Sequence, residues 1–285
     1  MDTRSNDRGR LYLCPTPIGN LGDITERTLE TLKTADIIAA EDTRNTLKLL
    51  NHFGIRTPLT SYHEHNKYDK AAELVDSMLA GKTVACVTDA GTPAISDPGE
   101  VLVREAVGSG IDVISLPGAT AFVTALTVSG LSSRRFVFEG FLPREKKERR
   151  ALLEEIRNER RTMILYEAPH HLRTTLSELT GSLGEARRIA LCRELTKLHE
   201  EILRMTLGEA VSYYKGTEPR GEFVLVIEGR PAEEIEEEKR IGFENISLEE
   251  HVRQYEALGI DRKEAMKKVA VERGIPKREV YKSLL

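Results

Sequence analysis

The stretch RLYLCPTPIGNLGDITERTLETL, residues 10–32, joins a short apolar strand to an amphipathic helix through a stiff turn. Leu11–Cys14 is apolar, and from Thr25 onward the apolar side chains recur at helical spacing. A glycine-rich turn at such a junction usually holds a phosphate on free backbone N–H groups. This turn has prolines at 15 and 17, which lack an N–H. The junction therefore predicts α/β structure and a loop poorly suited to wrapping a pyrophosphate.

The same alternation of apolar runs and amphipathic stretches continues along most of the chain. Further strands are predicted over Ile37–Ala40, Thr83–Thr88, Asp112–Leu116, Arg135–Gly140, Thr162–Glu167, Arg188–Cys192 and Glu222–Glu228. Helices are predicted over Thr25–Lys33, Lys70–Ala80, Glu100–Ser109, Lys146–Glu159, His171–Leu179 and Leu207–Tyr214. This pattern indicates an α/β fold with a largely parallel sheet in at least the first half. Ligands of such sheets bind beyond the carboxyl ends of the strands.

Composition excludes several classes of protein. The chain has 285 residues, enough for about two domains, and no apolar run approaches the ~20 residues of a membrane span. Cys14, Cys86 and Cys192 are far apart in apolar runs, which predicts buried free thiols in a reducing compartment. The first ten residues are polar and do not resemble a signal peptide, so we expect a cytoplasmic protein. A net charge of −4 still leaves room for a local basic face.

Two later junctions share the stiffness of the first. VACVTDAGTPAISDPG, residues 84–99, and VISLPGATAFVTAL, residues 113–126, each run from a strand through proline and glycine into a helix. Each alone is typical of an ordinary tight turn. Three stiff loops at one edge of a parallel sheet, however, predict a mostly apolar cleft with a few fixed backbone donors. Such a cleft suits an adenine ring and an amino-acid tail better than a triphosphate.

The C-terminal part differs from the rest of the chain in composition and in the spacing of its apolar residues. Residues 231–246 are rich in glutamate and are predicted to form a charged linker. Residues 247–285 contain a capping box at Ser247–Glu250, a second helix start at Asp261 and a third helix over Lys277–Leu284. They predict a small module that is similar to a helix-turn-helix and has an excess of lysine and arginine. Three roles stay open for it: holding a nucleic acid, holding another protein, or stabilising a dimer.

Six segments occur together in one order: PTPIGNLGDIT, AEDTRNT, DAGTPAISDPG, LPGATA, GFLPR and YEAPHH. In this the chain resembles the tetrapyrrole methylase family of S-adenosylmethionine enzymes, in its branch that acts on small-subunit ribosomal RNA. The resemblance covers residues 10–229 and implies two α/β domains, 10–118 and 119–230, with the cofactor between them. It further implies a homodimer and 2′-O-methylation of a cytidine in the 16S RNA of the 30S subunit.

The resemblance also assigns residues to the cofactor, S-adenosyl-L-methionine. Because this ligand has no phosphate, the prolines of the first loop are compatible with it. The matching positions are Pro15, Thr16, Pro17, Gly19, Asp89, Gly91, Thr92, Pro93, Ile95, Ser96, Pro117, Gly118, Ala119, Thr120, Glu167, Ala168, Pro169 and Gly221.

A proton acceptor would assist a ribose hydroxyl, which is a weak nucleophile. The position that matches the family is Asp42, at the end of the second predicted strand. An ion pair with Arg44, or a helix cap, explains Asp42 equally well. His63, Glu64 and His65 are the alternatives for the base. His63 and His65 have no evident third partner, so no metal is predicted.

RNA binding requires basic residues near the cleft. The candidates are Arg44, Arg144, Lys146, Lys147, Arg149 and Arg150. The alternative for the cluster at 144–150 is a solvated helix face balanced by nearby glutamates. Two other functions stay open: a methylase of a small tetrapyrrole, and a non-catalytic module that senses the cofactor and binds RNA.

Overall fold

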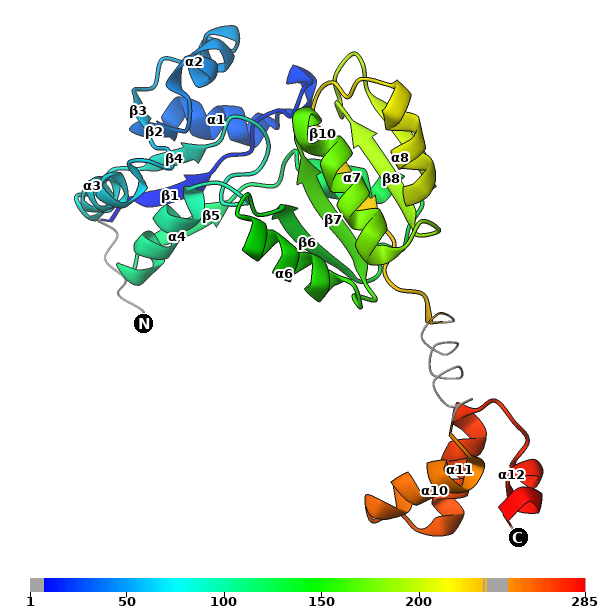
Figure 1. Ribbon diagram of the computed structural model, residues 1–285. Coiled ribbons are helices and arrows are strands. Elements are labelled where there is room, and N and C mark those ends of the chain that lie inside the picture. The colour runs from blue at the N-terminus through cyan, green and yellow to red at the C-terminus, as the bar shows by residue number, and fades with distance from the viewer. Residues whose placement is uncertain (1–7, 233, 235–245, 285) are drawn as a thin grey trace.

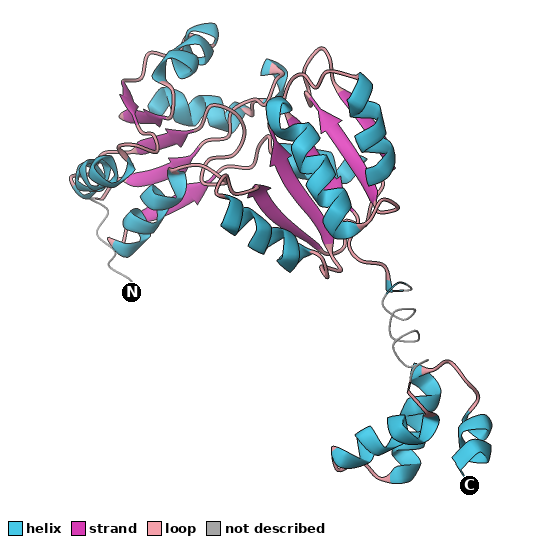
Figure 2. Cartoon of the chain, viewed as in Figure 1, coloured by secondary structure: helices cyan, strands magenta, loops and turns pink. Residues whose placement is uncertain are grey.

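The computed structural model describes residues 8–232, 234 and 246–284 of the chain (Figures 1 and 2). Two five-stranded sheets with flanking helices make up the part before residue 230, and three further helices follow residue 246. Our proposed division at 118/119 falls between the last strand of the first sheet and the helix that precedes the second. Within the described ranges, no helix is both long and apolar enough to cross a membrane.

The first sheet is parallel throughout, as the alternating pattern predicts. Its order is β3-β2-β4-β1-β5, over Leu59–Ser61, Ile37–Ala40, Val84–Val87, Arg10–Leu13 and Asp112–Ser115. One face packs on α3 (Lys67–Leu79) and α4 (Gly99–Gly108), and the other on α1 (Glu26–Thr34) and α2 (Thr43–His52). Because helices cover both faces, the strands are apolar runs rather than alternating ones. The loops after β1, β4 and β5 therefore meet at one edge.

The second sheet is mixed. Its order is β6-β7-β10-β8-β9, over Phe136–Phe141, Thr162–Glu167, Phe223–Ile227, Arg188–Arg193 and Glu201–Thr206. Only β6 and β7 pair in parallel. One face packs on α6 (Lys146–Ile156), α7 (Pro169–Leu183) and α8 (Leu207–Gly216), and the other on α5 (Ala121–Val128). Ile18, from the loop after β1, is buried in this second core. The first loop thus contacts both halves of the molecule.

The strand predictions are confirmed, with ends shifted by no more than one residue. The elements that the sequence missed are β3, β9, α2 and a one-turn 3₁₀ helix, Leu21–Asp23. β3 has three residues and β9 is a half-buried edge strand, so neither has a strong apolar signal. The three cysteines are free and buried, as predicted.

The C-terminal helices form a core of their own. They are α10 (Leu248–Ala257), α11 (Arg262–Glu272) and α12 (Lys277–Leu284), packed around Val252, Met266 and Val280. Ser247 caps α10 by accepting from the Glu250 N–H, and Asp261 caps α11 by accepting from the Lys263 N–H. The helix starts predicted from the sequence are therefore present. Most of the predicted linker at 231–246 lies outside the described residues.

Candidate active site

A cavity of about 390 Å³ lies between the two α/β halves, at the carboxyl edge of the first sheet. Its walls come from the loops after β1, β4 and β5 on one side, and from the ends of β6, β7, β8 and β10 on the other. Eight of the predicted cofactor residues line it: Asp89, Gly91, Thr92, Ile95, Ser96, Thr120, Glu167 and Ala168. The sequence therefore located the first wall of the cavity better than the second.

The first loop is bonded to the second loop through its backbone. The Thr16 N–H donates to the Gly91 carbonyl at 2.9 Å, and the Gly91 N–H donates back to the Thr16 carbonyl at 3.0 Å. The Thr16 hydroxyl also donates to the Thr88 carbonyl at 3.1 Å. These bonds occupy the N–H groups of Thr16 and Gly91, and the prolines at 15 and 17 have no N–H to offer a phosphate. The first loop acts as a support for the second rather than as an anion-binding nest.

The third loop packs into the same assembly. A Cβ atom built on Gly118 would lie 2.5 Å from the Pro15 Cβ atom, so the two loops are in close contact there. The Thr92 hydroxyl donates to the Ala119 carbonyl at 2.9 Å and lies 2.7 Å from the Thr120 hydroxyl. Seven of the predicted cofactor residues in or near these loops and the second half do not line the cavity: Pro15, Pro93, Pro117, Gly118, Ala119, Pro169 and Gly221.

The second loop has a strained backbone. Ala94 and Ser96 have φ values of 68° and 62°, a region that favours glycine. The Asp97 Oδ1 atom stabilises this path by accepting from the Ala94 N–H at 3.0 Å and from the Gly99 N–H at 2.7 Å. Asp97 also lines the cavity, and burial raises its pKa. Such strain is found where a loop is shaped for a ligand.

The second half contributes three carboxylate groups, and hydrogen bonds hold each of them: Glu167, Glu194 and Glu222, which accepts from Lys197 at 2.8 Å. Glu167 is buried, and it accepts from the Ala168 N–H at 2.8 Å and from the Thr175 hydroxyl. Glu194 accepts from Lys197 at 2.9 Å and from the Glu222 N–H at 2.9 Å. Sequence reasoning missed the Glu194–Lys197 segment. The signal that was available is its position directly after the strand β8.

The structure explains why position 221 is a glycine. Its φ is 77°, and a Cβ atom there would lie 2.4 Å from the Glu194 Cγ atom. Glycine at this position therefore allows Glu194 to approach the backbone before β10.

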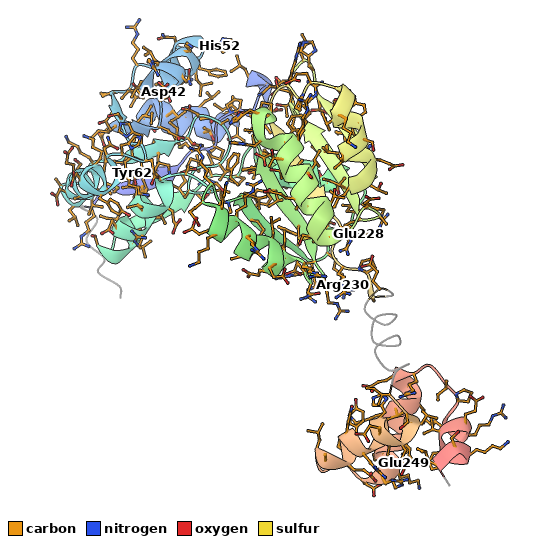
Figure 3. The ribbon with its side chains drawn as sticks, in the orientation of Figure 1. Asp42, His52, Tyr62, Glu228, Arg230 and Glu249 are labelled. Atoms are coloured by element: carbon orange, nitrogen blue, oxygen red, sulfur yellow. The ribbon has the colours of Figure 1, made fainter. Side chains whose placement is uncertain are left out.

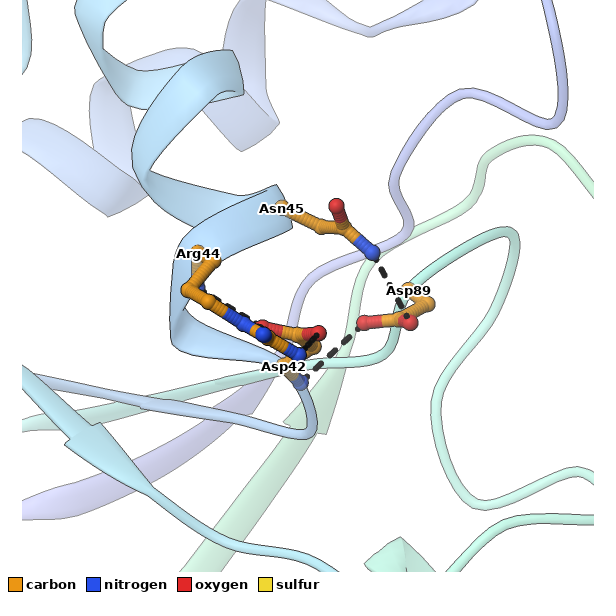
Figure 4. Close-up of polar contacts among 4 residues, drawn as sticks. All are labelled: Asp42, Arg44, Asn45 and Asp89. Atoms are coloured by element: carbon orange, nitrogen blue, oxygen red, sulfur yellow. Dashed lines mark hydrogen bonds and ion pairs between the residues drawn. The ribbon is translucent and has the colours of Figure 1, made fainter.

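Asp42 caps a helix and forms an ion pair with Arg44, which are the two alternatives to a catalytic base that the sequence left open. It is the N-cap of α2, where its Oδ1 atom accepts from the Arg44 N–H at 2.8 Å. The Arg44 guanidinium lies 2.8 Å from the Oδ2 atom (Figure 4). Hydrogen bonds from the Arg44 side chain and backbone lower the pKa of Asp42 to about 2. A carboxylate with so low a proton affinity is a poor base, and Asp42 does not line the cavity.

The other candidate bases also lie away from the cavity. Glu64 forms an ion pair with Lys67 at the start of α3, and the His63 N–H donates to the Asn66 side chain at 2.8 Å. None of the three alternatives, His63, Glu64 and His65, is among the residues that line the cavity. The geometry therefore does not support them as proton acceptors.

Asp42→Asn tests this interpretation. Because the pKa of Asp42 is about 2 in the folded protein, below the ordinary 3.8, its ionised form stabilises the fold above about pH 4. That contribution is lost as the pH falls toward 2. We expect the difference in free energy of unfolding between wild type and variant to shrink over this range in urea titrations. Single-turnover methyl transfer should stay at the wild-type rate, and a large loss would restore Asp42 as the base.

The predicted basic cluster divides into two groups. Arg144, Lys146, Lys147 and Arg150 are exposed. Arg149 points inward, with its side chain 15% exposed, and donates to Glu178 at 2.6 Å and to the Thr175 hydroxyl at 2.7 Å. The prediction of a phosphate contact is therefore corrected at Arg149, whose donors are already used inside the protein. The exposed four follow β6, whose last residue, Phe141, lines the cavity.

The sequence of this chain is similar to those of known methyltransferases. Residues 10–211 match the family of Tetrapyrrole (Corrin/Porphyrin) Methylases. The chain is 53% identical over 276 residues to a Halalkalibacterium halodurans protein called ribosomal RNA small subunit methyltransferase I, covering 97% of this chain and 94% of that one. A Bacillus subtilis protein of the same name is 49% identical, with the same coverage.

Solved structures show the same fold at low sequence identity. Diphthine synthase has a TM-score of 0.61 at 14% identity, covering 77% of this chain and 90% of that one. Uroporphyrin III C-methyltransferase from Thermus thermophilus has a TM-score of 0.56 at 18% identity, covering 77% and 97%. The interlocked loops, the cavity between two α/β halves and the full-length similarity agree: this chain belongs to the tetrapyrrole methylase family, among the proteins called ribosomal RNA small subunit methyltransferase I.

Proposed function

We propose that this protein transfers a methyl group from S-adenosyl-L-methionine to the 2′-oxygen of a cytidine in the 16S RNA of the small ribosomal subunit. The observation that supports it best is the charge of the cavity between the α/β halves. Six carboxyl groups line that cavity: Glu41, Asp89, Asp97, Glu167, Glu194 and Glu222. The cation among the described lining residues is Lys197, which is neutralised by Glu194 and Glu222.

This acidic lining fits the proposed cofactor. S-adenosylmethionine has a cationic sulfonium and an ammonium group, both of which a carboxylate-rich wall favours. Its adenine ring would contact the apolar side chains of the cavity, such as Ile18, Phe141 and Leu195. The sulfonium supplies an activated methyl group when it is bound. The protein then has to bind the donor, exclude water and align the acceptor oxygen with the methyl carbon.

The exposed basic cluster at 144–150 is our proposed contact with the RNA backbone. We expect Arg144→Glu/Lys146→Glu/Lys147→Glu to weaken the affinity for small subunits and to flatten its dependence on salt, because fewer phosphates are then neutralised. Lys33→Glu/Lys82→Glu reverses two charges at the opposite edge of the first sheet, where both residues are exposed, and is the control for Lys146→Glu/Lys147→Glu, which reverses two charges of the cluster. If the triple variant and the wild type bind small subunits with equal affinity, the cluster is a solvated helix face and not an RNA contact.

Radiolabelled cofactor and small subunits from cells lacking this protein test the proposed reaction. We expect label on the ribose of one cytidine, located by digestion and mass spectrometry. Cofactor binding by calorimetry without any label on RNA would contradict the proposal and favour a tetrapyrrole acceptor or a non-catalytic module. Our accompanying proposals are a homodimer, tested by sedimentation of the purified chain, and a cytoplasmic location, tested by cell fractionation.

A further inference from the structure

A second cavity, of about 370 Å³, lies directly beside the cofactor cavity. The first loop forms one of its walls, with Thr16, Pro17 and Gly19, and α2 forms the other. Four residues predicted from the sequence as cofactor contacts therefore line this second space: these three and Asp89. The two cavities share Thr88 and Asp89. A ligand in one cavity and a ligand in the other would meet at these two residues.

Asp89 is held in place at this shared wall. Its Oδ1 atom accepts from the Asp42 N–H at 3.1 Å, and its Oδ2 atom accepts from the Asn45 side-chain amide at 3.3 Å (Figure 4). Each oxygen of a carboxylate has two lone pairs, so each retains one for a further donor. The start of α2 thus orients Asp89 and leaves it able to accept from a ligand hydroxyl.

The second cavity differs from the first in its chemistry. Pro17, Leu21 and Leu49 give it apolar surface for the face of a base. Lys48 and His52 add exposed nitrogen donors along α2, which runs from the Asp42 cap to His52 (Figure 3). No described residue forms an ion pair with Lys48 in the way that Glu194 and Glu222 do with Lys197. A cavity lined by apolar and basic side chains suits an anionic nucleotide.

We propose that the second cavity binds the acceptor nucleotide and that Asp89 is the proton acceptor of the reaction. The ribose hydroxyl lies against Asp89, and its oxygen bonds to the methyl carbon as the carbon–sulfur bond breaks. The electron pair of that bond stays on sulfur, which becomes a neutral thioether, and the hydroxyl proton passes to the Asp89 carboxylate. This inference rests on the proposed methyl transfer to RNA.

Filling the second cavity tests the location. We expect Leu21→Trp to raise the KM for small subunits about tenfold by occupying the space of the base, with unchanged cofactor affinity in calorimetry. Leu47→Trp is the matched control, because Leu47 is an exposed leucine of α2 outside this cavity. Lys48→Glu, compared with Lys33→Glu, should likewise weaken direct binding of small subunits. If Leu21→Trp and Leu47→Trp have the same KM for small subunits while the wild type is active, the nucleotide does not bind in the second cavity. The proposed methyl transfer to RNA would stand.

Asp89→Asn tests the chemistry. An amide keeps the shape of the side chain but does not take up the proton, so the single-turnover rate should fall about 100-fold at saturating cofactor. Binding of small subunits should persist. A wild-type rate at saturating cofactor, combined with weaker cofactor binding, would make Asp89 a cofactor contact and overturn its role as acceptor. If the wild-type protein transfers no methyl group to small subunits, the proposed function is wrong, and this inference fails with it.

Discussion

Replacing Gly118 with alanine is expected to lower the free energy of unfolding by about 1–3 kcal/mol, the usual cost of an added methyl group in a packed site. The new Cβ atom would lie 2.5 Å from the Pro15 Cβ atom and 2.8 Å from its Cγ atom. A proline ring has little freedom to move, so one of the two loops has to shift. A displaced first or third loop would alter the cavity wall at Thr92 and Thr120.

We therefore also expect cofactor affinity to fall about tenfold in Gly118→Ala, equivalent to about 1.4 kcal/mol. Calorimetry with S-adenosylmethionine and urea unfolding would measure the two effects. Gly181→Ala is the control, because Gly181 lies in α7 with no atom within 4 Å of the added methyl group. That change should stabilise the protein by about 0.5 kcal/mol, since alanine is the better helix former. Equal stability and affinity in the two variants would refute the close packing of the loops.

Arg149→Ala is expected to cost about 2–3 kcal/mol of stability, below the 3–5 kcal/mol of a fully buried pair because Glu178 is partly hydrated. The side chain of Glu178 is 35% exposed, against 15% for Arg149. Removing the guanidinium leaves Glu178 unpaired and takes a donor from Thr175, which itself bonds to Glu167 at the cavity. The loss therefore reaches the cavity wall through two hydrogen bonds.

Arg150→Ala is the matched comparison one residue further along α6. Arg150 is exposed, so its stability should stay within about 0.5 kcal/mol of wild type. Its affinity for small subunits should fall, with a salt slope reduced by about 1. Urea unfolding and binding at several salt concentrations separate the two arginines. The assignment fails if Arg149→Ala unfolds like wild type or if both variants lose RNA affinity equally.

The strands, the three stiff loops and the family were readable from residue order. Apolar runs such as Val84–Val87 are local signals, and proline and glycine restrict the backbone wherever they occur. The same reasoning placed Asp89, Gly91 and Thr92 at the cavity, because parallel strands bring their carboxyl ends to one edge. The second wall was predicted less completely, since the Glu194–Lys197 segment follows an antiparallel strand and carries no turn signature.

The directions of side chains and the packing of elements against one another account for the rest. Arg149 and Arg150 are neighbours in one charged run, yet they point in different directions because successive helical residues are about 100° apart. Whether Asp42 acts as a base or a cap depended on where Arg44 lies, and the split of the loop residues between two cavities depended on α2. Residue order records which groups are present, whereas their function follows from which groups folding brings within a few ångströms, such as Arg149 with Glu178 and Thr16 with Gly91.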